Sequence, residues 1–170
     1  LDLFPLRHVR IFGRGETNRR ILQEKSESLG LSALDLSDPR DVIEDADIIV
    51  SSLPLQTGLE PFLETDWVKP GAYVNLLDLA RTWRPETLAQ FDRIIVEDAV
   101  QERQMSPQMI PPELIGEDLL DLVTGRTSGR INDADRIAFI FRGLAIGDLA
   151  LAILVYERAR RSGIGTSVPR

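Results

Sequence analysis

Residues His8–Gly30 read H-V-R-I-F-G-R-G-E-T-N-R-R-I-L-Q-E-K-S-E-S-L-G, and they carry the strongest structural signal in the chain. The β-rich run His8–Phe12 leads into a glycine turn, and a helix is predicted to open at Glu16 and to end at Gly30 as its C-cap. A strand, a glycine turn and a helix in this order bring backbone N–H groups and the positive end of a helix to one point, where an anion can bind. Three arginines crowd this turn of an otherwise acidic chain: Arg14, Arg19 and Arg20.

The composition is that of one ordinary globular domain. The chain has 170 residues, of which 43% are hydrophobic and 28% are charged, and its net charge is −7. Nucleic acid is not an expected partner, because a protein that binds it needs a net basic surface. The chain has no cysteine, which excludes disulfides and thiolate metal sites and makes a reducing cytoplasm the expected compartment. The single histidine, His8, is expected at a strand edge, so we predict no metal site, and no apolar run is long enough to span a membrane.

Strands and helices alternate along the chain, which is typical of a parallel, doubly wound α/β sheet. After 8–12, strands are predicted at 47–54, 72–77 and 92–98, and helices at 84–90, 112–122 and 145–161. A short helix is predicted to begin at Asp38-Pro39, residues 60–67 are expected to be helical or irregular, and 101–112 to be a polar loop. Leu1–Leu6 has no initiator Met and no signal-peptide pattern, so we expect the 170 residues to be the later part of a longer chain.

The glycine turn has two competing interpretations as a nucleotide site. In the first, Gly13-Arg14-Gly15 begins a G-x-G-x-x-G dinucleotide fingerprint, with Asp35 as the ribose-binding acid further along. Two residues oppose it, because Asn18 replaces the third glycine and Arg10 lies in a strand that should be apolar on both faces.

In the second interpretation, 8–12 is the second Rossmann strand, and the turn after it binds the adenosine ribose. An acid in this turn selects NAD, whereas an arginine accommodates the 2′-phosphate of NADP. Gly13 occupies the place of the acid and Arg14 follows it, so guanidinium groups and a helix N-terminus would form a phosphate pocket. The residues of this pocket are Arg14, Thr17, Asn18 and Arg19. The third alternative is a solvated turn that binds nothing.

Two further candidate sites follow predicted strands, where ligands bind in doubly wound sheets. Ser51 and Ser52 end the strand 47–54 and could face the ribose or the nicotinamide of a cofactor, or could simply leave the strand. Asp78 follows the strand 72–77 and could hold a substrate ammonium or act as a general base, or could cap the next turn.

Several segments together resemble the ornithine cyclodeaminase/mu-crystallin family over nearly the whole chain. The N-terminal ones are V-R-I-F-G-R-G-E-T-N and A-D-I-I-V-S-S-L-P, and the later ones are W-V-K-P-G-A-Y-V-N, G-L-A-I-G-D-L-A-L-A, V-Y-E-R-A and G-I-G-T. The resemblance implies a Rossmann-type, mostly parallel sheet whose first strand and glycine fingerprint lie upstream of Leu1, and it therefore favours the second interpretation of the turn.

The resemblance also implies a division of the chain. Residues 1–130 would be a partial NAD(P)-binding Rossmann domain, and 131–170 would return to a substrate-binding and dimerisation domain that is mostly absent. The apolar stripe of the helix 145–161 would pack on that domain and would otherwise be exposed, which predicts dimerisation or aggregation of this chain alone. A homodimer is the expected assembly.

The family resemblance implies hydride transfer with NADP(H), or with NAD(H), at the α-carbon of a small amino acid or at the corresponding cyclic imine. Arg14, Gly15, Thr17 and Asn18 match the turn around the 2′-phosphate, and Ser51, Ser52 and Leu53 match the segment at the nicotinamide ribose. Asp78 is the candidate catalytic residue.

Two segments depart from the pattern of the cyclodeaminases. L-L-D-L-A-R-T-W-R-P-E replaces a G-G-D-C-P-G-K-type loop, and Phe139–Gly143 lacks the lysine of the F-K-S-x-G segment. The function expected is therefore that of an amino-acid dehydrogenase, a cyclic imine reductase or a cyclodeaminase-like oxidoreductase, and these departures argue against ornithine cyclisation itself. The alternative function is that of a non-catalytic NADP(H)-dependent binding or carrier protein of the mu-crystallin type.

Overall fold

The computed structural model describes residues 4–54, 56–166 and 168, and its elements alternate between strands and helices. The strands are β1 (His8–Ile11), β2 (Ser32–Asp35), β3 (Ile48–Ser51), β4 (Tyr73–Leu76), β5 (Arg93–Val96), β6 (Glu117–Asp118) and β7 (Ile137–Ile140). The α-helices are α1 (Glu16–Ser28), α2 (Pro39–Ile43), α3 (Ala99–Gln104), α4 (Leu119–Val123) and α5 (Ala145–Arg161), and the 3-10 helices are η1 (Thr65–Trp67), η2 (Pro85–Gln90) and η3 (Pro112–Leu114).

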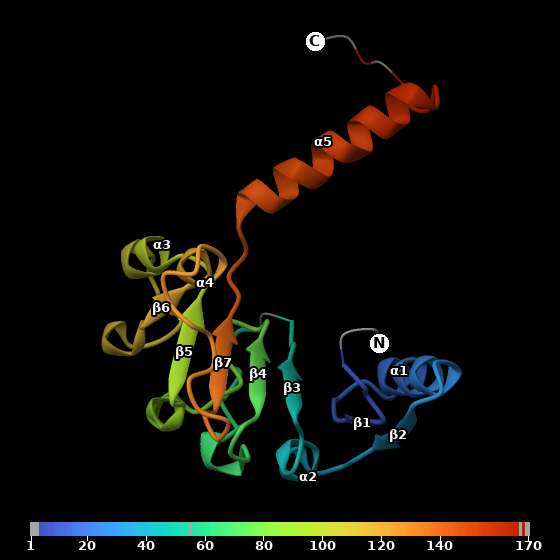
Figure 1. Ribbon diagram of the computed structural model, residues 1–170. Coiled ribbons are helices and arrows are strands. Elements are labelled where there is room, and N and C mark those ends of the chain that lie inside the picture. Colours follow the sequence, from blue (N-terminus) through green and yellow to red (C-terminus); the bar gives the residue numbers. More distant parts are fainter. Residues whose placement is uncertain (1–3, 55, 167, 169–170) are drawn as a thin grey trace.

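All of the strand pairs are parallel, as the alternation of strands and helices predicts. The strands form two groups, a pair β1-β2 and a five-stranded sheet in the order β3-β4-β7-β5-β6. Figure 1 shows the pair β1-β2 standing beside β3 with α1 on its outer side. No backbone pairing joins β1 to β3 among residues 4–54, so the sheet is interrupted between these two strands.

Several local predictions are confirmed. Asp38 caps α2 by accepting a hydrogen bond from the backbone N–H of Arg40 at 2.8 Å. The C-cap of α1 is Leu29 rather than the predicted Gly30, which follows it with a left-handed φ of 80°. α5 spans the predicted helix 145–161.

Other local predictions are wrong. β7 is absent from the predicted strands, although it lies at the centre of the sheet between β4 and β5 and so carries the sheet beyond residue 130. The predicted loop 101–112 begins inside α3, whose N-cap Asp98 accepts from the backbone N–H of Gln101 at 2.8 Å. The predicted helix 112–122 is divided among η3, β6 and α4.

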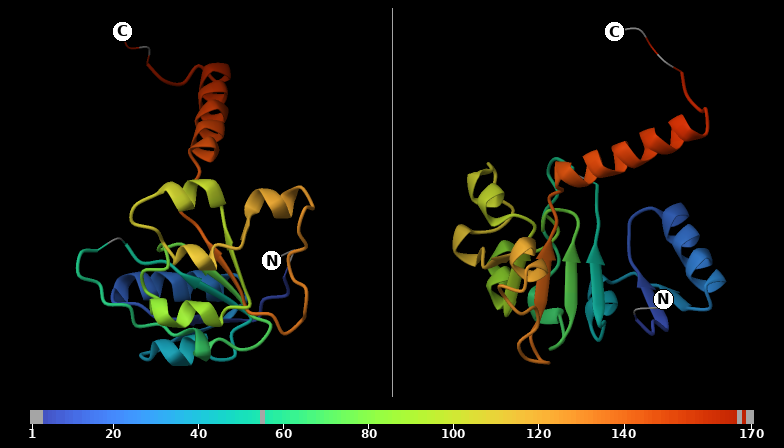
Figure 2. Two further views of the ribbon diagram at one scale, coloured as in Figure 1. Left: turned by 90° about the vertical axis from the view of Figure 1, so that its left-hand side faces the viewer. Right: turned by 45° about the horizontal axis from the view of Figure 1, so that its top comes forward.

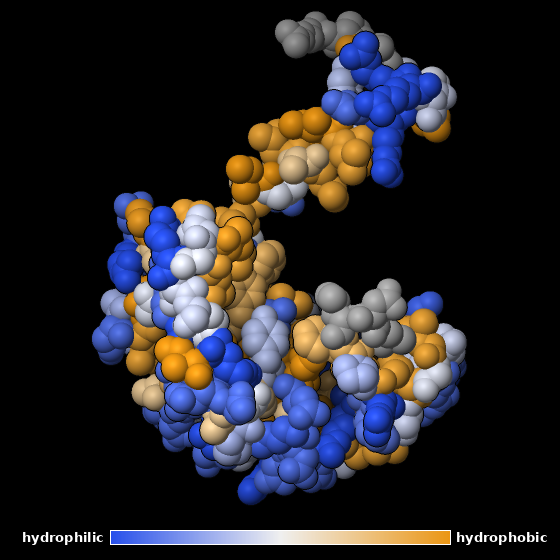
Figure 3. Space-filling model, in the orientation of Figure 1, coloured by the Kyte–Doolittle hydropathy of each residue, from blue (hydrophilic) through white to orange (hydrophobic). Residues whose placement is uncertain are grey.

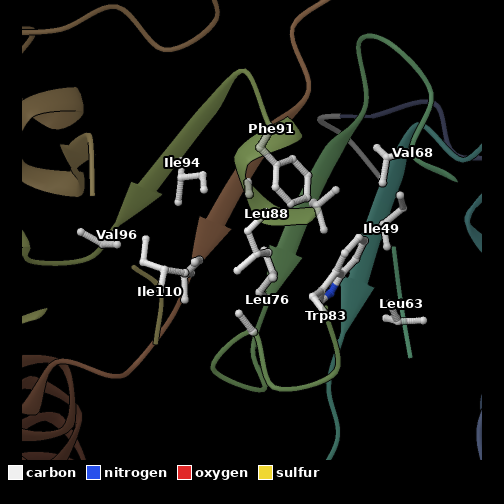
Figure 4. Close-up of a cluster of buried hydrophobic side chains, with 14 of the residues drawn as sticks. Ile49, Leu63, Val68, Leu76, Trp83, Leu88, Phe91, Ile94, Val96 and Ile110 are labelled. Atoms are coloured by element: carbon white, nitrogen blue, oxygen red, sulfur yellow. The ribbon is translucent and has the colours of Figure 1, made fainter. Parts of the chain in front are cut away.

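One face of the five-stranded sheet is covered by a hydrophobic core. The strand residues on this face include Ile49, Val74, Leu76, Ile94 and Val96, and all are buried. Figure 4 shows Trp83, Leu88 and Phe91, from the segment after β4, packed against these strands. The segment that connects β4 to β5 is therefore part of the cover, together with residues before β4 and after β5 such as Leu63 and Ile110.

The opposite face is open where it includes β3 and β4. Ile48 and Val50 point to this face because side chains alternate along a strand, and Val50 is 57% exposed. On β4, the side-chain oxygen Oδ1 of Asn75 is buried but accepts no hydrogen bond from the described residues. The exposed apolar side chains on β3 indicate a face that lacks its usual cover, and the unpaired Asn75 oxygen is a polar group that a covering segment could satisfy.

Helix α5 projects away from the rest of the molecule (Figures 1 and 2). Its apolar side chains are exposed, among them Ile146 at 73%, Leu149 at 59% and Tyr156 at 63%. Figure 3 shows apolar surface over the first part of α5 and hydrophilic surface at its far end, where the last turn carries Arg158, Arg160 and Arg161. No helix within the described ranges is long and apolar enough to cross a membrane.

Glu117, on the edge strand β6, makes the stability of this edge sensitive to acid. Its carboxylate accepts hydrogen bonds from the Arg93 guanidinium and from the Thr127 hydroxyl, the latter at 2.9 Å. The bond from Arg93 is the main reason why the pKa of Glu117 lies below its ordinary value of 4.5.

A depressed pKa means that the contribution of Glu117 to stability is complete above its unfolded pKa and is lost as the pH falls through its folded pKa. We therefore expect Glu117→Gln to have a lower urea midpoint of unfolding than the wild type at neutral pH. The difference between the two midpoints should become smaller under acid conditions. The control is Glu113→Gln, because Glu113 is exposed and forms no ion pair with any described residue. A gap that stays constant as the pH falls would contradict the prediction.

Candidate functional site

The glycine turn lies at the carboxyl end of β1 and at the start of α1. Arg14 is exposed, and its Nη2 donates to the side-chain oxygen of Gln56 at 2.7 Å. Gly15 is the N-cap of α1 and has no side chain to bond the first N–H groups of the helix. These N–H groups, and a guanidinium held only by a neutral amide, are available to an anion.

The other residues of the predicted phosphate pocket differ in whether their side chains already have hydrogen-bond partners. Thr17 and Asn18 are exposed in the first turn of α1. Arg19 is committed elsewhere, because its Nε lies 2.8 and 2.9 Å from the two carboxylate oxygens of Asp35, and its Nη1 donates to the Gly13 carbonyl. Asp35 therefore binds a guanidinium in this structure, and Arg14 is the arginine of the turn without an acidic partner among the described residues.

Strand pairing favours the second interpretation of the turn. A first Rossmann strand is central and has the fourth strand beside it. Here β1 pairs with β2 through His8 to Ile11, whereas no described residue of β1 pairs with β3. This is the arrangement expected of a second and a third strand.

A cavity of about 640 Å³ lies beyond the carboxyl ends of β3, β4 and β7. The segment after β3 contributes Gln56, Thr57, Gly58, Leu59 and Pro61, and the segment after β4 contributes Leu79, Ala80, Arg81 and Pro85. The remaining lining residues are Pro107, Gln108, Met109 and Arg142. Gln56 both lines this cavity and accepts the hydrogen bond from Arg14, so the glycine turn and the cavity adjoin.

Asp78 does not lie on the surface of this cavity. It is 2% exposed, and its carboxylate accepts from the Ser51 hydroxyl at 3.1 Å and from the Thr82 hydroxyl at 2.7 Å. The Nε1 of Trp83 donates to the Ser51 hydroxyl at 3.1 Å. These four residues form a buried network, which we call the Asp78 lock. Asp78 does not line the cavity, and its contact with a substrate amine stays a prediction.

The Asp78 lock holds a strained turn. Leu79 and Ala80 follow Asp78 with φ values of 60° and 58°, in the left-handed region that residues with a side chain avoid. Each such residue costs about 1–2 kcal/mol, and a conformation of this kind persists only where its surroundings determine it. The network on Asp78 and the burial of Trp83 supply these surroundings, so the lock fixes the part of the β4–β5 segment that lines the cavity.

The candidates at the end of β3 lie in different surroundings. Ser51 is buried, and its hydroxyl belongs to the Asp78 lock. Ser52 is exposed and Leu53 is half-buried, and neither lines the cavity. Over residues 4–54, 56–166 and 168, no cluster of three or more His, Cys, Asp or Glu residues could hold a metal ion.

Two arginines of the cavity wall were not predicted from the sequence. Arg81 lies in the strained turn, and Arg142 follows β7. Arg142 donates from Nε to the buried Glu102 at 2.9 Å and from Nη2 to the Pro107 carbonyl at 3.2 Å. The sequence does place Arg81 in the segment directly after a predicted strand, where ligands bind. The same position rule applies to Asp78, and it does not distinguish between the two residues.

The model of the ornithine cyclodeaminase/mu-crystallin family matches residues 1–163. An N-((2S)-2-amino-2-carboxyethyl)-L-glutamate dehydrogenase from Staphylococcus aureus is 28% identical over 117 residues, which are 64% of this chain and 34% of the relative. An alanine dehydrogenase from Archaeoglobus fulgidus is 25% identical over 177 residues, which are 94% of this chain and 53% of the relative.

Solved structures agree with the family match. The Thermococcus litoralis Δ1-pyrroline-2-carboxylate reductase in complex with NADH and L-proline superimposes with a TM-score of 0.79 at 25% identity, over 98% of this chain and 55% of the neighbour. The chain thus spans between a third and about half of the length of these relatives. Its strand arrangement is that of a Rossmann-type α/β fold. The chain belongs to the ornithine cyclodeaminase/mu-crystallin family.

Proposed function

We propose that the chain is the nucleotide-binding part of an NAD(P)H-dependent oxidoreductase that acts on a small amino acid or a cyclic imine. The observation that carries this proposal is the 2.7 Å hydrogen bond between Arg14 and Gln56, which joins the glycine turn to the wall of the cavity. A dinucleotide bound across this junction would have its adenosine ribose at the turn and its nicotinamide toward the cavity. The bound nicotinamide would supply the hydride, and the residues of the chain would bind and orient.

The turn favours NADP(H), with NAD(H) as the other possible cofactor. Arg14 has a neutral partner that a phosphate can displace, and Thr17, Asn18 and the start of α1 lie next to it. Asp35 is the acid that the first interpretation of the turn assigned to the ribose, and its charge is neutralised by Arg19. Glu16 adds one negative charge to the first turn of α1, so the charge of Arg14 is decisive for a 2′-phosphate.

The test is a fluorescence titration of the full natural chain with NADPH and NADH. We expect Arg14→Ala to weaken NADPH binding by about 10- to 100-fold, the usual loss when a charge-assisted hydrogen bond is removed, and to change NADH binding little. Arg20→Ala is the matched control, because Arg20 lies on α1 close to the turn and its Nε is already 3.9 Å from a carboxylate oxygen of Glu24. Equal losses for the two nucleotides would refute the 2′-phosphate assignment, and no binding of either would refute the oxidoreductase.

The open surfaces support a larger assembly. We propose that a further strand and helix of the same Rossmann domain fill the interruption between β1 and β3 and cover Ile48 and Val50. Helix α5 would pack its exposed apolar side chains on a substrate-binding and dimerisation domain, with a homodimer as the assembly and the cytoplasm as its location.

A carrier without catalysis is the second candidate function. The specific observation in its favour is the chemistry of the cavity wall, since none of the described residues that line it is an Asp, Glu, His, Lys, Tyr or Cys. A steady-state assay with NADPH and a panel of cyclic imines separates the two. Turnover identifies an enzyme whose acid–base group comes from another part of the assembly, and cofactor binding without turnover identifies the carrier.

A further inference from the structure

The wall of the cavity has an unusual charge for this protein. The whole chain has a net charge of −7, yet the described lining residues include two arginines and no acidic residue. An acid-free wall with cations attracts anions, since the field inside a concave site is less screened than at an open surface.

Only one of the two arginines has an uncompensated charge among the described residues. Arg142 is 17% exposed and is paired with Glu102, which is 2% exposed, at 2.9 Å. Arg81 is exposed, and its side chain forms neither a hydrogen bond nor an ion pair with residues 4–54, 56–166 or 168. Arg81 is therefore the cation of the wall that is free to bind a ligand.

The backbone around Arg81 is held in a defined conformation. Leu79 and Ala80 hold left-handed conformations directly before it, and its own N–H donates to the Asp78 carbonyl at 3.2 Å. The Asp78 lock keeps this turn in place through the buried Thr82 and Trp83 directly after it. Backbone strain that the surroundings maintain is typical of ligand sites.

We propose that Arg81 binds a carboxylate of the substrate. This inference rests on the proposed oxidoreductase function and deepens it, because it assigns the substrate side of the same site. A guanidinium on a cavity wall matches a carboxylate in charge and in its bidentate geometry. The carboxylate can be the α-carboxylate of every amino-acid or imine substrate, or the second carboxylate of an acidic one. Arg81 then selects for acidic substrates in the second case alone.

The test compares two imines that differ in the second carboxylate. Δ1-Pyrroline-2-carboxylate has one carboxylate, and iminosuccinate, formed in solution from oxaloacetate and ammonia, has two. The full natural chain and its Arg81→Gln variant are assayed with both imines and saturating cofactor, and cofactor binding is titrated separately. The matched control is Arg126→Gln, because Arg126 is paired with Asp121 at 2.7 Å and does not line the cavity.

We expect Arg81→Gln to raise KM by about 10- to 100-fold, with cofactor binding unchanged and partial recovery in Arg81→Lys. A rise in KM for both imines identifies the α-carboxylate as the partner of Arg81. A rise in KM for iminosuccinate alone identifies the second carboxylate. Unchanged KM values for both imines would overturn the proposal. So would a loss of cofactor affinity with unchanged KM, because Arg81 would then bind the nucleotide.

If the wild-type chain reduces neither imine, the oxidoreductase proposal fails and Arg81 is tested by binding. The probes are succinate and pyrrole-2-carboxylate, titrated calorimetrically into the cofactor-saturated protein. Binding by the wild type that is lost in Arg81→Gln and kept in Arg126→Gln supports a carboxylate site without the catalytic function. No binding, or equal binding by all three proteins, overturns the site.

Discussion

Trp83→Ala is expected to lower the free energy of unfolding by about 3–5 kcal/mol, the range found when a fully buried aromatic side chain is truncated. Trp83 is 0% exposed, and its ring lies 5.7 Å from that of Phe91 in a tilted arrangement. The indole also donates to Ser51, so the variant loses apolar burial and leaves a buried hydroxyl with one bond fewer. Urea unfolding followed by circular dichroism measures the change.

Trp67→Ala is the control for this prediction because it removes the same side chain from the edge of the core. Trp67 is only partly buried, and it packs against the core cluster from η1. Its loss should cost less than half as much as the loss of Trp83. Similar costs for the two variants would mean that Trp83 is not the centre of the core that covers the sheet.

Asp78→Ala is expected to lower the free energy of unfolding by about 2–4 kcal/mol, since it leaves two buried hydroxyls without an acceptor. Ser51 and Thr82 both donate to Asp78, and the left-handed Leu79 and Ala80 lose the network that holds them. The turn that carries Arg81 should then relax, so substrate KM should rise more than cofactor Kd. Urea unfolding and steady-state kinetics of the same preparations measure both effects.

A double-mutant cycle tests whether these residues act as one network. Ser51 donates to Asp78 at 3.1 Å. The double variant Asp78→Ala/Ser51→Ala should therefore lose about 0.5–3 kcal/mol less free energy of unfolding than the sum of the two single variants. The matched control combines Asp66→Ala with Ser51→Ala, because Asp66 is exposed and lies in η1 rather than in the network. The effects of this control pair should be additive. If the effects of Asp78→Ala and Ser51→Ala were simply additive, the Asp78 lock would not exist as described.

Local patterns predicted much of the fold. The strand–turn–helix unit at the glycine turn and the helix α5 both follow from hydrophobic periodicity and capping residues near in sequence. β7 could not be located in this way, because the five apolar residues between Arg136 and Arg142 are equally compatible with a strand or a loop. Its place between β4 and β5 depends on pairing with strands more than 40 residues away in the chain.

The candidate site was predictable in its location but not in its side chains. The rule that ligands bind beyond the carboxyl ends of parallel strands pointed to the segments after β3 and β4, and both segments line the cavity. The direction of each side chain depended on long-range contacts. Asp78 is turned inward by Ser51, 27 residues earlier in the chain, and Arg81 is turned toward the cavity by the strained turn that follows from this.

The interruption of the sheet places the residue proposed to bind the nucleotide and the residue proposed to bind the substrate on two groups of strands that are not paired with each other. The turn with Arg14 belongs to the unit β1-α1-β2, whereas Arg81 belongs to the five-stranded body. On these proposals, substitutions within residues 8–35 should change cofactor preference while the cavity keeps its substrate selectivity. An engineer can exploit the same separation by grafting this unit from an NADH-dependent relative, and the exchange should leave the order of preferred substrates intact.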